Sequence, residues 1–368
     1  MGIGFHGRLT EERQIRAGFI GCGSHSFRNL YPTLQFAPVD LIAVCDLDRD
    51  RAEAFAKQFG ASAAYDDYRA MLDSETLDAV FICTGYDAVG RPLYPGLAQD
   101  CLEAGCHVWM EKPPAATSAE IEALQQTAHA ANRHVLVGLK KMFFPANEKA
   151  HELMSTESFG TPHLVMLQYP QYVPTVDEFD EYHKGRLTPS VTGFLDHLCH
   201  PASLLIYLLG MPDTLHYARS ACGGGLATFG YASGAVASIV LTTGASLANG
   251  MERTLIVSDR GQHITVDNNI RVTLHRMPPV GYGDQPNYYQ GAAEQASAVW
   301  EPEFSLGQLY NKGLFLLGYY GEITEFARAI LDGRPPIKGH LEHAWQVTRI
   351  FEAFAEGPNR TINLTKQD

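Results

Sequence analysis

The feature that most constrains the fold is a regular alternation of short apolar runs and helix-compatible stretches over the first 140 residues. Apolar runs occur at 15–20, 41–45, 77–83, 107–110 and 134–138, and each has the length of a strand that is buried on both faces. Stretches with helical character lie between them, at residues 26–37, 49–59, 66–72, 93–104 and 118–131, the last with Ser118 as its N-cap. Because parallel strands need such crossover helices, the alternation predicts a parallel, doubly wound α/β sheet.

Beyond about residue 140 the pattern changes to consecutive short strands with glycine turns. Strands are expected at 162–169, 226–231, 235–242, 254–258, 263–266 and 271–275, helices at 146–155, 197–209, 319–331 and 341–356, and a loop at 280–305. Strands that follow one another through tight turns pair antiparallel. The chain is therefore expected to form a first domain at 14–140 and a second domain, of α+β type with a mostly antiparallel sheet, at 141–368.

Size and charge narrow the possible classes of protein. A length of 368 residues exceeds the size at which a single core stops growing, which favours two domains. The formal net charge of -13 and the lack of Lys/Arg runs argue against a nucleic-acid partner. Residues 1–13 have no apolar core, and the longest apolar run, 204–209, is too short to span a bilayer. A small-molecule enzyme without a membrane partner or a signal peptide is expected.

The seven cysteines form an odd set without a CxxC pair. Cys22, Cys45 and Cys83 lie within or next to apolar runs. This usage is typical of buried, reduced thiols in a cytoplasmic protein, and no metal site is expected.

A glycine turn follows the first apolar run. It consists of Gly21, Cys22, Gly23, Ser24, His25 and Ser26. Glycines allow a tight turn and a close approach of the backbone to a pyrophosphate. Asp46 ends the second run, where a carboxylate accepts hydrogen bonds from ribose hydroxyls and repels a 2'-phosphate, so NAD is favoured. Arg49 and Arg51 lie close enough in sequence that NADP stays possible as the cofactor. The alternative to nucleotide binding is an ordinary glycine turn in an α/β protein.

The run 107–110 ends at Glu111-Lys112-Pro113-Pro114. A proline pushes the preceding residue into an extended conformation, and the Lys112–Pro113 bond can be cis. Lys112 would then lie just past the carboxyl end of a parallel strand, the edge at which open α/β sheets bind ligands. The alternative is a solvated surface lysine in a proline turn.

Asp196 and His200 are four residues apart, and on a helix they would share one face. A histidine that titrates near neutrality can accept a hydroxyl proton during dehydrogenation, and Asp196 can orient it. Since proline is tolerated only in the first helical turn, Pro201 predicts a helix that begins near Leu198. A purely structural pair, with Asp196 as N-cap, is the alternative.

These motifs together resemble those of the Gfo/Idh/MocA oxidoreductases. The matching residues are Gly21-Cys22-Gly23 with Asp46, Ala104-Gly105-Cys106-His107-Val108, Glu111-Lys112-Pro113, Asp196-x-x-x-His200, Leu208-Leu209-Gly210, Glu322 to Leu331, and Asp332-Gly333-Arg334-Pro335-Pro336. The resemblance runs from about residue 15 to 363.

The resemblance implies a Rossmann domain and a second domain whose large open sheet makes homodimer or homotetramer contacts. It also implies that the C-terminal helices pack back on the Rossmann domain. In such a protein Lys112 hydrogen-bonds the reacting hydroxyl, His200 exchanges its proton and Asp196 positions both. Thr84, Gly85 and Glu111 would join the glycine turn in holding the cofactor.

The sequence also departs from the family pattern. Gly85 follows Thr84 where proline is usual, Tyr94 stands where a histidine would align, and Lys141 replaces a common arginine. The candidate substrate-lining residues are Tyr94, Lys141, Tyr169, Tyr172, His183 and His197, together with the pair Tyr288 and Tyr289. For each of them the alternative is ordinary packing.

The sequence therefore predicts an NAD(P)-dependent oxidoreductase that acts on a hydroxyl-bearing carbon of a sugar, glycoside or cyclic polyol. Two alternatives stay open. One is an NAD-dependent glycoside hydrolase that works by transient oxidation and elimination, and the other is a non-catalytic sugar or nucleotide sensor.

Overall fold

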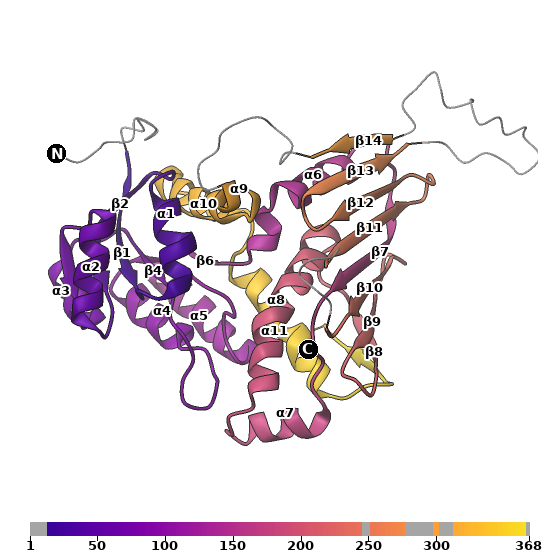
Figure 1. Ribbon diagram of the computed structural model, residues 1–368, viewed down its shortest axis with the longest axis horizontal. Helices are drawn as coiled ribbons and strands as arrows, with labels where there is room; N and C mark the ends of the chain where they lie inside the picture. Colours follow the sequence, from indigo (N-terminus) through magenta and orange to yellow (C-terminus); the bar gives the residue numbers. More distant parts are fainter. Residues whose placement is uncertain (1–12, 245–250, 277–296, 302–311, 366–368) are drawn as a thin grey trace, which may run out of the picture. The chain divides into compact units, whose positions relative to one another are not determined.

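A computed structural model describes residues 13–244, 251–276, 297–301 and 312–365 of the chain (Figure 1). The chain forms two compact units. Unit 1 consists of Met1–Phe143 and Gly313–Thr348, and unit 2 of Phe144–Lys312 and Arg349–Asp368. Each unit is described by itself below.

Unit 1 is built on a six-stranded sheet in which every neighbouring pair is parallel, in the order β3-β2-β1-β4-β5-β6. Its strands are β1 (Ile15–Ile20), β2 (Val39–Cys45), β3 (Ala63–Tyr65), β4 (Ala79–Ile82), β5 (His107–Met110) and β6 (Val135–Val137). The predicted parallel, doubly wound Rossmann sheet is therefore confirmed. Strand order reverses at β1 and β4, which is the switch point where such sheets bind their ligands.

The helices of unit 1 begin and end where local chemistry places them. They are η1 (Ser26–Leu30), α1 (Tyr31–Leu34), α2 (Arg49–Phe59), α3 (Tyr68–Ser74), α4 (Tyr94–Glu103), α5 (Ser118–Ala131), η2 (Lys140–Phe143), α9 (Lys312–Leu316), α10 (Tyr319–Asp332) and the first part of α11 (Leu341–Ala355). Helix α2 ends at Gly60 with φ 85°, a left-handed cap that glycine adopts readily. The predicted N-cap of α5 was wrong by one residue, because Thr117 forms a capping box with Glu120.

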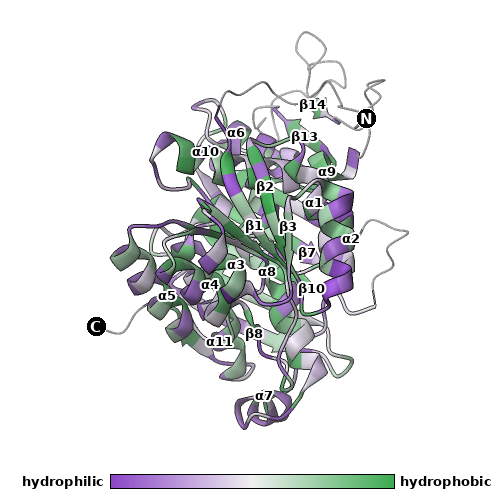
Figure 2. Ribbon diagram, turned by 90° about the vertical axis from the view of Figure 1, so that its left-hand side faces the viewer, coloured by the Kyte–Doolittle hydropathy of each residue, from purple (hydrophilic) through white to green (hydrophobic). Residues whose placement is uncertain are grey.

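One face of the parallel sheet is aromatic. Phe19 and Phe81 stack with ring centroids 5.9 Å apart, and Trp109 lies 5.8 Å from Phe81. Tyr31 of α1 stacks on Phe19 at 4.1 Å, and Phe326 of α10 meets Phe81 edge-on at 5.5 Å. Helix α10 therefore completes the core of unit 1, although residues 144–312 of unit 2 separate it from the parallel strands in the sequence. Figure 2 shows hydrophobic residues along β1 and β2, whereas α2 carries both hydrophilic and hydrophobic residues.

Unit 2 contains a nine-stranded sheet in the order β14-β13-β12-β11-β7-β10-β9-β8-β15. Its strands are β7 (Pro162–Tyr169), β8 (Thr214–Arg219), β9 (Gly225–Gly230), β10 (Val236–Leu241), β11 (Arg253–Ser258), β12 (His263–Asp267), β13 (Arg271–His275), β14 (Ser297–Trp300) and β15 (Thr361–Asn363). Among the described strands of this sheet, only β7 and β10 pair in parallel, so the predicted large, mostly antiparallel sheet is confirmed. The prediction of a continuous loop at 280–305 was wrong at β14. Tyr288 and Tyr289 lie outside the described residues.

One face of this sheet is buried and the other is open. In β10, Ala237, Ile239 and Leu241 are buried, whereas Val236 on the other face is exposed together with Met166 and Leu226. The helices of unit 2 are α6 (Pro145–Met154), α7 (Val176–His183), α8 (Pro189–Leu209) and the last part of α11. Of these, α8 contacts β7 and α6 contacts β12 and β13.

Two expectations for unit 2 need correction. Helix α8 begins at Pro189 rather than near Leu198, so Pro201 lies inside it. The lost hydrogen bond is offset by burial of the apolar residues around Pro201, among them Phe194 and Leu205. The cysteines were expected to be buried, and six of them are, but Cys222 is exposed; all seven are free thiols.

No helix among the described residues has the length and apolarity to cross a membrane.

Candidate active site

The glycine turn follows β1, and residues of the turn itself fix its conformation. Gly21 has φ 110°, and a Cβ there would lie 2.0 Å from the carbonyl oxygen of Cys83, so only glycine fits. The hydroxyl of the fully buried Ser26 donates hydrogen bonds to the carbonyl oxygens of Gly21, at 3.1 Å, and Gly23, at 2.9 Å. A serine in the third position of the motif therefore fixes the turn instead of disrupting it.

Asp46 ties the end of β2 to this turn. Its Oδ2 accepts a 2.7 Å hydrogen bond from the amide of Cys22, and its Oδ1 accepts one of 3.0 Å from the amide of Asp48. Arg51 Nη1 lies 3.7 Å from Oδ1. The carboxylate is thus held beside the glycine turn, where an acid can meet the ribose of a dinucleotide.

The residues around the turn fit a dinucleotide. A Cβ at Gly23 or Gly85 would meet no atom within 4 Å, so the backbone there is open to close approach. The buried hydroxyl of Thr84 at the carboxyl end of β4 has no hydrogen-bond partner among the described residues, and such a group calls for a ligand or a water. The Tyr94 hydroxyl donates to the Thr84 carbonyl at 2.7 Å. An open backbone, a carboxylate and an unsatisfied hydroxyl at one sheet edge suit NAD.

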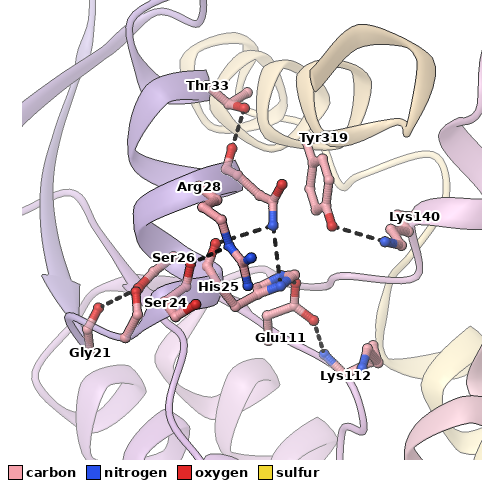
Figure 3. A network of polar contacts seen from close by, with 12 residues as sticks. Gly21, Ser24, His25, Ser26, Arg28, Thr33, Glu111, Lys112, Lys140 and Tyr319 are labelled. Carbon is pink, nitrogen blue, oxygen red and sulfur yellow. Dashed lines mark hydrogen bonds and ion pairs between the residues drawn. The ribbon is translucent and has the colours of Figure 1, made fainter. Parts of the chain in front are cut away.

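Glu111 and Lys112 follow β5 at the same edge of the sheet, and the Lys112–Pro113 bond is cis. Glu111 is only 4% exposed. Its Oε2 accepts a 2.9 Å hydrogen bond from the Lys112 amide, and its Oε1 lies 2.9 Å from His25 Nε2 (Figure 3). Burial alone would raise the pKa of Glu111, but His25, Lys112 and Lys140 lower it below its usual value. Glu111 is therefore a buried anion.

Three further residues lie around Glu111, and none of them was predicted from the sequence as a site residue. Lys140 Nζ donates to the Tyr319 hydroxyl at 2.8 Å, and the Tyr319 ring lies edge-on to His25 at 5.9 Å (Figure 3). Glu322 is fully buried, and neither of its carboxyl oxygens has a hydrogen-bond partner among the described residues. Burial and the charge of Glu111 raise the pKa of Glu322 well above its usual value. Glu322 is therefore a neutral acid.

The remaining predicted residues of unit 1 are Tyr94 and Lys141. Both are buried, Tyr94 at the start of α4 and Lys141 in η2. Their contact with a substrate stays a prediction.

Helix α8 carries Asp196, His197 and His200 in unit 2. His197 Nε2 lies 3.6 Å from Asp196 Oδ2, and the His197 and His200 rings are 6.2 Å apart. The ring of Tyr169, at the end of β7, lies 6.0 Å from that of the buried His200. Burial raises the pKa of Tyr169 far above neutrality, so its hydroxyl stays protonated. The structure thus brings these four predicted residues together.

Tyr172 and His183 lie elsewhere in unit 2. The Tyr172 hydroxyl donates to Glu178 Oε2 at 3.0 Å and accepts from Arg219 Nη2 at 3.0 Å. His183 ends α7, with its ring 6.4 Å from that of Phe179. These contacts are with protein, and a substrate role for either residue stays a prediction, as does the meeting of Lys112 with Asp196 and His200.

The parallel sheet, the glycine turn and the placement of Asp46 define a dinucleotide-binding protein of the Rossmann type. Residues 15–139 match the profile of the oxidoreductase family with the NAD-binding Rossmann fold, Gfo/Idh/MocA. Over these residues the chain is similar to this family, as its motifs predicted, and the family is described as having an NAD-binding Rossmann fold.

Similar proteins include a D-xylose 1-dehydrogenase (NADP(+)) from Haloferax volcanii, which is 29% identical over 205 residues, 54% of this chain and 58% of that protein. The chain spans about half the length of the curated relatives that it matches. A dehydrogenase from Chromobacterium violaceum has the same fold, with a TM-score of 0.77, 23% identity and coverage of 94% of this chain and 96% of that one. An oxidoreductase from Agrobacterium radiobacter, solved with NAD+, L-tartaric acid and magnesium, has a TM-score of 0.75, 14% identity and coverage of 95% and 98%.

Proposed function

We propose that this protein is an NAD(P)-dependent dehydrogenase that oxidises a hydroxyl-bearing carbon of a sugar, glycoside or cyclic polyol. One observation supports this most strongly. The 2.9 Å contact between His25 and Glu111 joins the glycine turn after β1 to the Glu111-Lys112 corner after β5. A cofactor held by the turn and a hydroxyl held by Lys112 would therefore lie at one edge of the sheet.

The proposed roles follow from the chemistry of each side chain. When bound, NAD supplies the acceptor for the hydride that leaves the substrate carbon. The ammonium of Lys112 donates a hydrogen bond to the reacting hydroxyl, the imidazole of His200 accepts its proton, and Asp196 orients the histidine and the substrate. The cofactor is proposed to contact Gly21, Cys22, Gly23, Ser24, His25, Ser26, Asp46, Thr84, Gly85, Glu111 and Lys112.

NAD is proposed over NADP because the Asp46 carboxylate would repel a 2'-phosphate. Arg51, which lies 3.7 Å from Asp46, keeps NADP as the second possibility, and the Haloferax relative carries NADP(+) in its name. The affinities of the purified protein for NAD and for NADP can be measured by the quenching of its tryptophan fluorescence, and their ratio decides between the two cofactors.

The substrate is proposed to be a sugar or polyol because several relatives are named for such compounds, D-xylose and D-apiose among them. Appearance of NADH or NADPH should be measured with aldoses, alkyl and aryl glycosides, and inositols. Net formation of the reduced cofactor supports the dehydrogenase. Release of the aglycone from a glycoside without net formation of reduced cofactor would instead indicate the hydrolase. Saturable sugar binding without turnover would indicate a sensor.

Substrate contacts are proposed for Tyr94, Lys141, Tyr169, Tyr172, His183 and His197. We further propose a homodimer or homotetramer formed through the open face of the unit 2 sheet, where Met166, Leu226 and Val236 are exposed. The seven free thiols support a reducing compartment such as the cytoplasm.

A further inference from the structure

The imidazole of His25 has a protein partner at each of its nitrogens. Asn29 Nδ2 lies 3.2 Å from the carbonyl oxygen of His25 and 3.3 Å from its Nδ1. A carbonyl oxygen can only accept, so the amide nitrogen of Asn29 faces His25 and donates to Nδ1. The proton of the neutral ring is therefore on Nε2, which donates to Glu111 Oε1 at 2.9 Å.

Glu111 passes this constraint to the main chain of Lys112. One carboxylate oxygen accepts a hydrogen bond from the imidazole, and the other accepts a hydrogen bond of 2.9 Å from the Lys112 amide (Figure 3). The side chain of His25 is 41% exposed, whereas that of Glu111 is 5% exposed. The half-exposed His25 of the glycine turn thus orients the buried carboxylate of Glu111, which accepts a hydrogen bond from the backbone amide of Lys112.

We propose that His25 is a positioning residue for Lys112, acting through Glu111, rather than chiefly a cofactor ligand. The inference rests on the proposed function, in which Lys112 binds the reacting hydroxyl. Its chemistry is a fixed hydrogen-bond chain from Asn29 through His25 and Glu111 to the Lys112 amide. The residue therefore couples the shape of the glycine turn to the placement of the lysine.

Loss of the imidazole would leave a buried carboxylate that has lost one of its donors. A buried charge of this kind recruits another donor when one is near. The ammonium groups of Lys112 and Lys140 already act electrostatically on Glu111. We expect Lys112, the neighbour in sequence, to be drawn toward Glu111 and away from the substrate.

The experiment compares His25→Leu, which removes the donor, with His25→Gln, whose amide can replace it. His129→Leu is the matched control, because His129 is exposed in the last turn of α5. The primary readout is competitive labelling of lysines by trace acetic anhydride, with Lys112 quantified by mass spectrometry against the exposed Lys57. Affinity for NAD and turnover of the most active sugar in the panel are measured on the same preparations.

We expect His25→Leu to lower Lys112 labelling at least 3-fold and to lower kcat, measured at saturating NAD, at least 10-fold. His25→Gln should restore both to within 3-fold, and His129→Leu should match the unmodified protein. Unchanged Lys112 labelling in His25→Leu would overturn the inference, as would a weakened Kd for NAD with kcat unchanged at saturating cofactor. If Lys112→Ala keeps full turnover, the catalytic role of Lys112 fails, while the labelling ratio still decides whether His25 positions it.

Discussion

Glu111 and Glu322 are two buried carboxyl groups of unit 1 whose pKa values move in opposite directions. Glu111 has hydrogen-bond donors at both oxygens and is an anion. Glu322 has no partner at either oxygen among the described residues, and the charge of Glu111 helps to keep it protonated. One negative charge therefore suffices for the pair, and it belongs to the residue next to Lys112.

This difference predicts opposite results for two equivalent substitutions. Glu322→Gln replaces a neutral acid by a neutral amide of the same shape, so the free energy of unfolding at pH 7 should be equal or higher. Glu111→Gln puts the side-chain NH2 group opposite one of the two donors, His25 or the Lys112 amide, so that one hydrogen bond is lost. This should lower the free energy of unfolding by about 1–3 kcal/mol. Urea unfolding of both variants measures the difference, and equal losses would contradict the assignment of the charge.

The pH dependence of stability should separate the two residues as well. The pKa of Glu111 is lowered by folding, so its charge stabilises the protein above its ordinary pKa of 4.5, and this contribution is lost as the pH falls. The pKa of Glu322 is raised, so its contribution is present below pH 4.5 and is lost as the pH rises. The stability of Glu322→Gln relative to the unmodified protein should therefore increase above pH 4.5, by at most about 1.4 kcal/mol per pH unit. Unfolding curves between pH 4 and 8 test this, and a flat difference would refute it.

Lys112→Ala should retain NAD binding and lose turnover by about 10² or more, as expected when a hydrogen-bonding partner in proton transfer is removed. Lys57→Ala, an exposed lysine of α2, is the control and should be unaffected. Turnover of a panel sugar and the Kd for NAD are measured in parallel. An unchanged rate would remove Lys112 from the mechanism.

Asp46→Ala should reduce the preference for NAD over NADP, because the carboxylate that repels a 2'-phosphate is lost. The Cys22 amide also loses its 2.7 Å acceptor, so affinity for both cofactors should fall somewhat. The ratio of the two Kd values is the measurement, with Asp50→Ala on the exposed first turn of α2 as control. Equal use of NAD and NADP by the unmodified protein would disprove the proposed preference.

The two glycines of the turn should respond differently to alanine. At Gly21 a Cβ would clash at 2.0 Å with backbone and adopt an unfavourable φ of 110°, so Gly21→Ala should destabilise unit 1 by roughly 2 kcal/mol or more. At Gly23 a Cβ meets nothing, so stability should change by less than about 1 kcal/mol. NAD affinity should nevertheless fall for Gly23→Ala, since the Cβ would occupy the space of the cofactor. Thermal unfolding and NAD titration of both variants check these expectations.

Much of this architecture could be predicted from periodicity alone. The runs 107–110 and 162–169 are strands with the predicted limits, and 49–59 is a helix with the predicted limits. Strand β3 was missed because its three residues are only half-buried and leave no apolar run. The start of α8 was misplaced because local rules penalise Pro201, whereas tertiary burial decides whether the helix continues.

For the candidate site, the strand-end rule correctly placed the glycine turn and the Glu111-Lys112 corner at one sheet edge. The contact of Lys140 with Tyr319 joins residues 179 positions apart. The burial of Glu322 likewise depends on how α10 packs, because an acidic residue inside an amphipathic helix gives no local sign that it is buried. Such contacts follow from tertiary packing and have no signature in the sequence pattern.

The packing of Phe326 against Phe81 has a consequence for biosynthesis. A nascent chain that has emerged only as far as residue 143 carries every strand of the parallel sheet but not α10, so the ring of Phe81 lacks its cover. Unit 1 is completed only after the ribosome has also translated residues 144–312, the first segment of unit 2. Chaperone occupancy during synthesis should therefore persist until α10 emerges.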